Sequence, residues 1–151
     1  LKSVQIQFSL LAPDLGKQYQ VKKICDENNI DFFAYSPLSF GILCIDPDKE
    51  ENKEKSFIRN SLFENYKKPT YELRRCLKRI AHQRSVSQAQ VAINWCCYQG
   101  TIPLVGMRKK SQVIDVSNVF NWNLKKNEFK VLQEASKKCL KKMPKNPFSS
   151  N

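Results

Sequence analysis

The chain has 151 residues, a length typical of one domain, and its hydrophobic fraction of 41% excludes an intrinsically disordered chain. Lys and Arg number 26 against 14 Asp and Glu, which gives a net charge of +12. The lysines are scattered from Lys2 to Lys145 without a zinc finger, KH loop or RRM aromatic motif, so a solvated basic surface is favoured over a specific nucleic-acid or anionic-membrane partner.

A strand–helix–strand pattern opens the chain. Residues 4–8 and 30–35 are short and β-rich, and residues 19–28 have helical periodicity and end at Asn28-Asn29. Such a unit predicts two parallel neighbouring strands joined by a right-handed crossover. The inner face of the predicted helix carries Val21, Ile24 and Cys25.

The segment after the second predicted strand is a loop from Ser36 to Gly41. Pro37 cannot extend a ladder of hydrogen bonds, and Gly41 permits close approach of the backbone to a ligand. Residues 44–69 are charged and interrupted by prolines, which predicts a mobile surface insertion. Within it, a short amphipathic helix is predicted from Phe57, Ile58, Leu62, Phe63 and Tyr66.

Two helices are predicted next, over residues 71–84 and 89–98. Ser87 followed by Gln90 is a capping box for the second helix, and Gly100 is placed to end it. The second helix is almost entirely apolar, so it should be buried on most sides. The first is expected to turn inward the side chains of Leu73, Cys76, Leu77, Ile80 and Ala81.

Residues 102–105 form an apolar run of strand length that Gly106 ends. A polar segment with Arg108, Lys109 and Lys110 then opens a helical pattern over residues 111–119. The first N–H groups of a helix have no intrahelical partner, and the macrodipole adds partial positive charge there, so phosphates bind at such ends. This stretch therefore indicates an anion site, with a solvated turn as the alternative.

The last predicted helix covers residues 124–136, and residues 137–151 are predicted to be a loose basic tail. The side chains expected on its inner face are Phe129, Val131, Leu132 and Ala135.

Six cysteines and one histidine, His82, have no spacing typical of a zinc site. The absence of a recognisable signal peptide favours reduced, buried thiols in a cytoplasmic protein. No apolar run approaches the roughly 20 residues that span a bilayer. The chain begins at Leu1 and enters a strand at once, so we expect it to be a segment of a longer protein.

Four stretches of the chain resemble the aldo-keto reductase family, in the family's order. They are VQIQFSLL at residues 4–11, FAYSPLSFGIL at 33–43, IAHQRSVSQAQVAINW at 80–95 and IPLVGMRKKSQ at 102–112. The resemblance implies an α/β fold that is the C-terminal part of a (β/α)8 TIM barrel, with about three parallel strands and outer helices. The whole chain, residues 1–151, would be one partial barrel.

The resemblance also implies chemistry. The family reduces aldehydes and ketones with NADPH, through an Asp, Tyr, Lys and His tetrad on earlier strands of the barrel. No catalytic residue is therefore expected in this chain, and the isolated segment is expected to be inactive. His82 and Tyr35 do not match the tetrad.

Much of the cofactor site is implied to lie here. Gln5 matches the residue that binds the nicotinamide carboxamide, and Tyr35 matches an aromatic residue that stacks on the nicotinamide ring. A guanidinium at Arg108 would favour NADPH over NADH by binding the 2′-phosphate. The remaining matches are Ser36, Leu38, Ser39 and Gly41 for the pyrophosphate, and Gly106, Arg108, Ser111, Gln112 and Asp115 for the adenosine side.

Two other functions remain open on the same resemblance. One is a nucleotide-sensing regulatory subunit of the potassium-channel β type. The other is a degenerate, non-catalytic barrel fragment whose basic surface binds a partner. Three strands alone would leave both sheet edges open, which suggests further chain or self-association to cover them.

Overall fold

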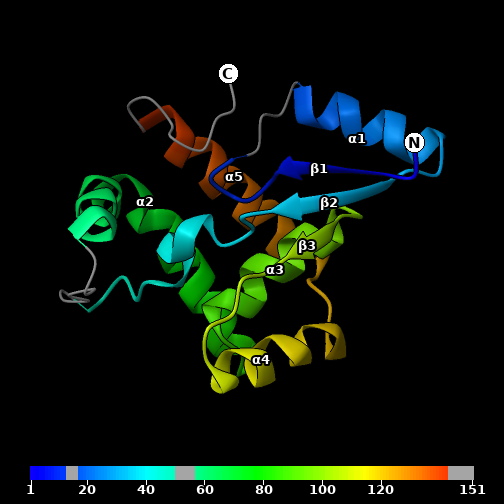
Figure 1. Ribbon diagram of the computed structural model, residues 1–151. Coiled ribbons are helices and arrows are strands. Elements are labelled where there is room, and N and C mark those ends of the chain that lie inside the picture. The colour runs from blue at the N-terminus through cyan, green and yellow to red at the C-terminus, as the bar shows by residue number, and fades with distance from the viewer. Residues whose placement is uncertain (13–16, 50–56, 143–151) are drawn as a thin grey trace.

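The computed structural model describes residues 1–12, 17–49 and 57–142, and these form a small parallel sheet covered by helices (Figure 1). The strands are β1 (Ser3–Gln7), β2 (Asp31–Tyr35) and β3 (Ile102–Leu104), hydrogen-bonded in the order β1-β2-β3. Both pairs are parallel, which confirms the predicted βα arrangement.

The first crossover helix, α1 (Lys17–Glu27), ends as predicted, with Asn29 in the left-handed region at φ 53°. Its inner face was predicted only in part. Cys25 is buried, but Ile24 is 54% exposed, and Lys22 is buried with its ammonium hydrogen-bonded to Asp26. The long lysine stem covers apolar surface while its charge is satisfied locally, so a polar residue occupies the inner face.

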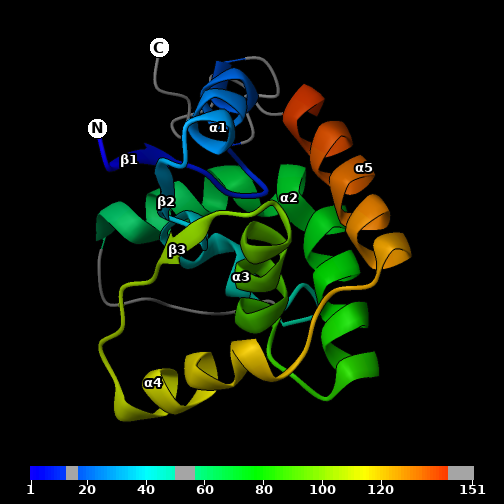
Figure 2. The same ribbon diagram turned by 90° about the vertical axis from the view of Figure 1, so that its right-hand side faces the viewer.

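The helices form two layers on one side of the strands. α3 (Gln88–Tyr98) lies next to the sheet, and α2 (Phe57–Arg84) and α5 (Lys126–Lys142) form an outer pair (Figure 2). Fully buried Trp95 of α3 stacks on Phe8 at 5.3 Å and on Phe129 of α5 at 6.2 Å between ring centroids. This aromatic stack joins the end of β1 to both helical layers.

The predicted ends of α3 are confirmed. The Ser87 hydroxyl accepts the backbone N–H of Gln90 at 3.1 Å, and Gly100 follows the helix with φ 71°. Every residue from 90 to 96 is buried, as expected for a helix that is apolar on all sides.

α2 differs most from the prediction. It is one helix of 28 residues that starts at Phe57 and passes through Pro69, where the sequence predicted a separate short helix and an insertion reaching residue 69. Proline removes an intrahelical donor, but here the Thr70 hydroxyl donates to the Tyr66 carbonyl at 2.6 Å, and Arg74 donates to the Lys67 carbonyl at 2.7 Å. Side-chain donors thus bond the carbonyls around the proline. Residues 50–56 of the predicted insertion lie outside the described residues.

Two short elements precede α5: α4 (Lys110–Ser117) and the 3-10 turn η2 (Asn118–Asn121). Because α5 continues to Lys142, residues 137–142 are helical rather than part of a loose tail, and Cys139 is buried. Residues 143–151 are beyond the described part. Val131, predicted to be inward, is 39% exposed.

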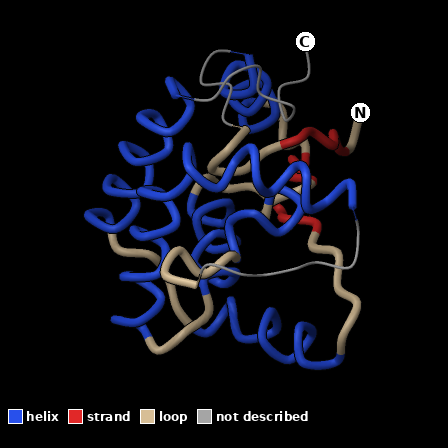
Figure 3. Tube along the Cα trace, turned by 90° about the vertical axis from the view of Figure 1, so that its left-hand side faces the viewer, coloured by secondary structure: helices blue, strands red, loops and turns tan. Residues whose placement is uncertain are grey.

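Figure 3 shows the strands as a minor part of a mostly helical fold, with α4 and α1 at opposite ends.

Candidate cofactor-binding site

The carboxyl ends of the three strands are level with one another. Gln7 of β1 pairs in register with Tyr35 of β2, and Tyr35 pairs with Leu104 of β3. The loop with Gly41 and the segment with Arg108 therefore leave the sheet at the same end, the carboxyl end of the strands. We call this end of the sheet, with the residues 36–41 and 105–112 that follow it, the rim.

Gln5 and Tyr35 project from the same face of the sheet. Gln5 pairs with Phe33, two residues before Tyr35, and side chains alternate between faces along a strand. Both side chains are exposed, whereas Phe32 and Ala34 on the other face are buried beneath the helices. The two residues predicted to contact the nicotinamide thus share the face that the helices leave open.

The loop 36–41 has an unusual backbone conformation. Four of its residues have positive φ: Ser36 at 54°, Ser39 at 49°, Phe40 at 57° and Gly41 at 95°. Three of these are not glycine, and such residues rarely adopt the left-handed region. Ser39 N–H donates to the Ser36 carbonyl and Gly41 N–H to the Leu38 carbonyl, both at 2.9 Å. Two of the amides predicted to bind pyrophosphate are therefore already hydrogen-bonded within the loop.

Ser39 fastens this loop to the chain that follows β1. Its hydroxyl lies 2.9 Å from the hydroxyl of Ser9, and both residues are 1% exposed. Ser9 also accepts the N–H groups of Leu11 and Ala12. The Ser39 side chain thus positions the loop, whose backbone was predicted to bind the pyrophosphate. Sequence reasoning missed Ser9, because its partner is 30 residues away.

The cationic part of the rim leads into α4, which starts at Lys110, one residue before the predicted start. The amide oxygen of Gln112 accepts the N–H groups of Arg108 at 2.8 Å and Lys109 at 3.0 Å. Gln112 therefore occupies the two backbone donors just before the helix, as the N3 side chain of a capping box does. Contact of Gln112 with the adenosine stays a prediction.

The Arg108 side chain is exposed, and no carboxylate of the described residues lies within 4.0 Å of its guanidinium. A Cβ added at Gly106 would meet no atom within 4 Å, so the space beside this residue is open. Lys109, Lys110 and Ser111 are also exposed. The rim thus keeps free positive charge beside open space, which suits an anionic ligand.

Asp115 faces α3. Its carboxylate accepts the Ser87 hydroxyl at 2.6 Å and the Gln90 amide at 2.7 Å, and the Gln90 oxygen accepts the Trp122 indole N–H at 3.1 Å. Both carboxylate oxygens therefore tie α4 to the start of α3. This structural role was absent from the sequence interpretation, which assigned Asp115 to the adenosine clamp.

Residues 45–48, which follow the loop of the rim in sequence, are held by side chains of α2. The Lys78 ammonium donates to Asp46 at 2.6 Å and to Asp48 at 2.8 Å, and the Lys78 hydrogen bond lowers the pKa of the Asp46 carboxyl. Arg74 is 3% exposed, and burial lowers the pKa of its guanidinium. Besides the Lys67 carbonyl, it contacts Thr70 Oγ1 at 3.1 Å and the Ile45 carbonyl at 3.5 Å.

Within the described ranges, no group of His, Cys, Asp and Glu side chains is arranged to hold a metal ion. The cysteines form no disulfide, and Cys44 is exposed although buried thiols were expected. Among the helices that the structure describes, none combines the length and apolar character needed to cross a bilayer.

Comparison with known proteins gives consistent matches. The model of the aldo/keto reductase family matches residues 1–137. A pyridoxal reductase of Arabidopsis thaliana, named as chloroplastic, is 36% identical over 151 residues, which cover 99% of this chain and 40% of that protein. The chain therefore spans well under half the length of this relative.

Two solved structures show the same fold. The glycerol dehydrogenase AKR11B4 from Gluconobacter oxydans superimposes with a TM-score of 0.74 at 21% identity, over 98% of this chain and 46% of that one. A mutant of Gox0644 in complex with NADPH gives a TM-score of 0.61 at 16% identity, over 89% of this chain and 38% of that one. The three strands and their helices are thus part of a TIM barrel of this type.

Proposed function

The chain belongs to the aldo/keto reductase family, and from this premise we propose that it is the C-terminal, cofactor-binding portion of an NADPH-dependent carbonyl reductase. The parent protein would transfer hydride from the nicotinamide to an aldehyde or ketone. The Asp, Tyr, Lys and His of the family would come from chain that precedes this segment. The segment by itself would then lack a proton donor and would not turn over substrate.

The observation that carries the proposal is the shared rim. Because β2 and β3 are parallel and Tyr35 pairs with Leu104, the loop 36–41 and Arg108 lie at the same end of the sheet. This is the carboxyl end of the strands, where ligands of TIM barrels bind. A glycine-containing loop follows β2, and after β3 comes a guanidinium that has no carboxylate partner in the part of the chain that the structure describes. This pair supports binding of a dinucleotide.

The residues on the rim and on the open face of the sheet fit NADPH in part. Arg108 has an exposed guanidinium without a carboxylate partner among the described residues, and it would hold the 2′-phosphate. Gln5 and Tyr35 lie on the open face of the sheet and would contact the nicotinamide. When bound, NADPH supplies the hydride. Ser39, Gln112 and Asp115 act first as supports, because their side chains are hydrogen-bonded within the chain. Contacts of Ser36, Leu38, Gly41, Gly106 and Ser111 with the cofactor remain proposals.

An aldehyde is the substrate class we favour, since the relative with 36% identity is named a pyridoxal reductase and pyridoxal is an aldehyde. The cellular compartment stays a prediction. The sequence favoured the cytoplasm, and the relative's name places that protein in the chloroplast.

The test uses the complete protein that contains this chain. Purified protein is mixed with NADPH and pyridoxal, and loss of NADPH absorbance is followed, with NADH and with pyridoxine, an alcohol, as controls. Turnover that needs both NADPH and the aldehyde supports the proposal. Tight NADPH binding without turnover of any aldehyde or ketone would point to the regulatory-subunit alternative. Absence of binding would point to the degenerate fragment.

A further inference from the structure

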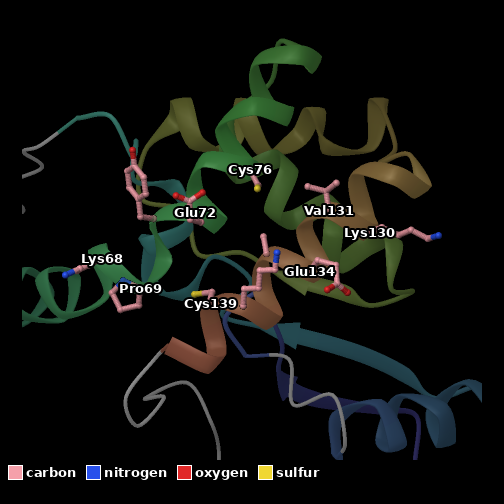
Figure 4. A pocket seen from close by; sticks show the side chains of 11 residues that line it. Lys68, Pro69, Glu72, Cys76, Lys130, Val131, Glu134 and Cys139 are labelled. Atoms are coloured by element: carbon pink, nitrogen blue, oxygen red, sulfur yellow. The ribbon is translucent and has the colours of Figure 1, made fainter.

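A groove of about 810 Å³ runs between α2 and α5 on the outer side of the helical layer (Figure 4). Its walls are mainly apolar or polarisable, and Val131, Ala135 and Cys139 from α5 face Cys76 from α2. Cys139 is buried, whereas Val131 is 39% exposed although it is aliphatic. The groove therefore presents apolar surface to solvent between two packed helices.

The groove is separate from the rim and from the open sheet edges. All of its lining residues belong to α2 and α5, and none belongs to a strand or to residues 36–41 or 105–112. The open edges are those of β1 and β3, which lie across α3 from this groove (Figure 2).

The charges around the groove are unequal. Two acids line it, and each is paired on its own helix: Glu72 with Arg75 at 3.8 Å and Glu134 with Lys137 at 3.0 Å. Three lysines, Lys68, Lys130 and Lys138, also line it, and no carboxylate of the described residues lies within 4.0 Å of their ammonium groups. The groove therefore has an apolar floor, and the lysine ammonium groups around it have no carboxylate partner among the described residues.

The size of the groove favours a small ligand over a protein. α2 and α5 are antiparallel, since the Arg84–Glu128 ion pair joins the end of one to the start of the other. From Lys68 to Cys76 the groove spans about 12 Å at a helical rise of about 1.5 Å per residue. Protein interfaces usually bury roughly 800 Å² per partner, more than two turns of helix can offer. The groove volume is within the range of small-molecule pockets.

We propose that the α2–α5 groove binds a medium-chain fatty carboxylate of about ten carbons, whose extended length matches ~12 Å. The alkyl chain lies on Cys76, Val131 and Ala135. The carboxylate is held where Lys68 of α2 and Lys138 of α5 both reach the groove. The chemistry is that of an amphipathic monoanion: burial of apolar surface provides affinity, and the lysines select for charge.

Decanoate is the probe, and the complete protein is titrated with it by calorimetry. We expect binding of one equivalent. Val131→Trp fills the groove from an exposed position, so the fold should tolerate it, and decanoate affinity should fall at least about tenfold. Ile24→Trp is the matched control, because Ile24 is an exposed aliphatic residue on α1 away from the groove. This control should bind decanoate as the wild type does.

The charge is tested with Lys68→Glu and Lys138→Glu, each expected to weaken decanoate about threefold to tenfold. Lys126→Glu, on α5 but outside the lining, should have no effect. Thiol labelling adds a position-specific measurement. Decanoate should slow labelling of Cys76 in the groove and leave exposed Cys44 unchanged.

Four results would overturn the proposal. Decanol binding as tightly as decanoate would remove the role of the lysines. Unchanged affinity in Val131→Trp would place the ligand elsewhere. Competition between decanoate and NADPH would place it at the rim. Binding only after removal of residues 143–151 would show that the chain's own tail occupies the groove.

Discussion

The Asp115 carboxylate accepts a 2.6 Å hydrogen bond from the Ser87 hydroxyl, which at the same time caps α3 by accepting the N–H of Gln90. One serine therefore caps the start of α3 and holds the last turn of α4 against it. α4 contains no buried residue, so polar contacts of this kind contribute much of what holds it on α3. The helix that carries the cationic rim is positioned by an acid that the sequence had suggested as a ligand.

This pairing predicts non-additive stability. Asp115→Ala and Ser87→Ala should each lower the free energy of unfolding by about 1–2 kcal/mol, and the double variant should lose less than the sum. Urea denaturation of the four proteins measures the coupling. Ser111→Ala, an exposed serine on the same helix, is the control and should change stability by less than about 0.5 kcal/mol. Full additivity would mean that the two residues act independently.

Arg108→Ala should separate the two nicotinamide cofactors. Removal of a guanidinium from a phosphate should raise the Kd for NADPH about tenfold or more, because charge-assisted hydrogen bonds are lost. NADH lacks the 2′-phosphate, so its Kd should change less than about twofold. Lys109→Ala is the matched control from the next residue, with a smaller loss. Equal losses for both cofactors would show that Arg108 does not contact the 2′-phosphate.

Arg74 should be needed for the continuous α2. Arg74→Met keeps the apolar stem but removes donors to the Lys67 and Ile45 carbonyls, so the free energy of unfolding should fall by about 2–3 kcal/mol. Arg75→Met changes the neighbouring exposed arginine, whose ion pair with Glu72 is long, and should cost less than about 0.5 kcal/mol. Chemical denaturation compares the two. Similar losses would mean that the carbonyl contacts of Arg74 add little.

Stability should depend on pH through Glu128. The Arg84 hydrogen bond lowers the pKa of Glu128 from its ordinary value of 4.5, and the side chain is only 11% exposed. A carboxyl whose pKa is lower in the folded than in the unfolded protein stabilises the fold fully at pH values above its unfolded-state pKa. This stabilisation is lost as the pH falls through its folded-state pKa. Glu128→Gln should therefore destabilise the protein by about 1 kcal/mol at neutral pH, with a smaller difference in acid.

Thermal melts across the acidic range measure this effect. Glu134→Gln is the comparison, because Glu134 is 62% exposed and pairs with Lys137 on the same helix. Its melting temperature should follow that of the wild type at every pH. A Glu128→Gln difference that stays constant from neutral to acidic pH would rule out the ionised carboxylate as its source.

The sequence by itself determined the elements whose signals are local. Short β-rich or apolar runs placed all three strands, and an almost entirely apolar run placed the buried α3. Ser87, Asn29 and Gly100 marked helix ends by their capping chemistry. The order of the βα units then implied parallel strands, and both strand pairs of the structure are parallel. These features depend on a few neighbouring residues, so they can be read without the rest of the fold.

Only the tertiary structure decided how side chains are used. Around Pro69, Arg74 donates to the Lys67 carbonyl of its own helix and to the Ile45 carbonyl 29 residues away, and Ser39 is tied to Ser9 across 30 residues. Asp115 faces α3 because the Ser87 hydroxyl and the Gln90 amide donate hydrogen bonds to its carboxylate there. A polar side chain bonds whichever partner the packed chain brings within reach, and that partner is distant in sequence. Residue type alone therefore could not separate the residues that support the rim from those left to face a ligand.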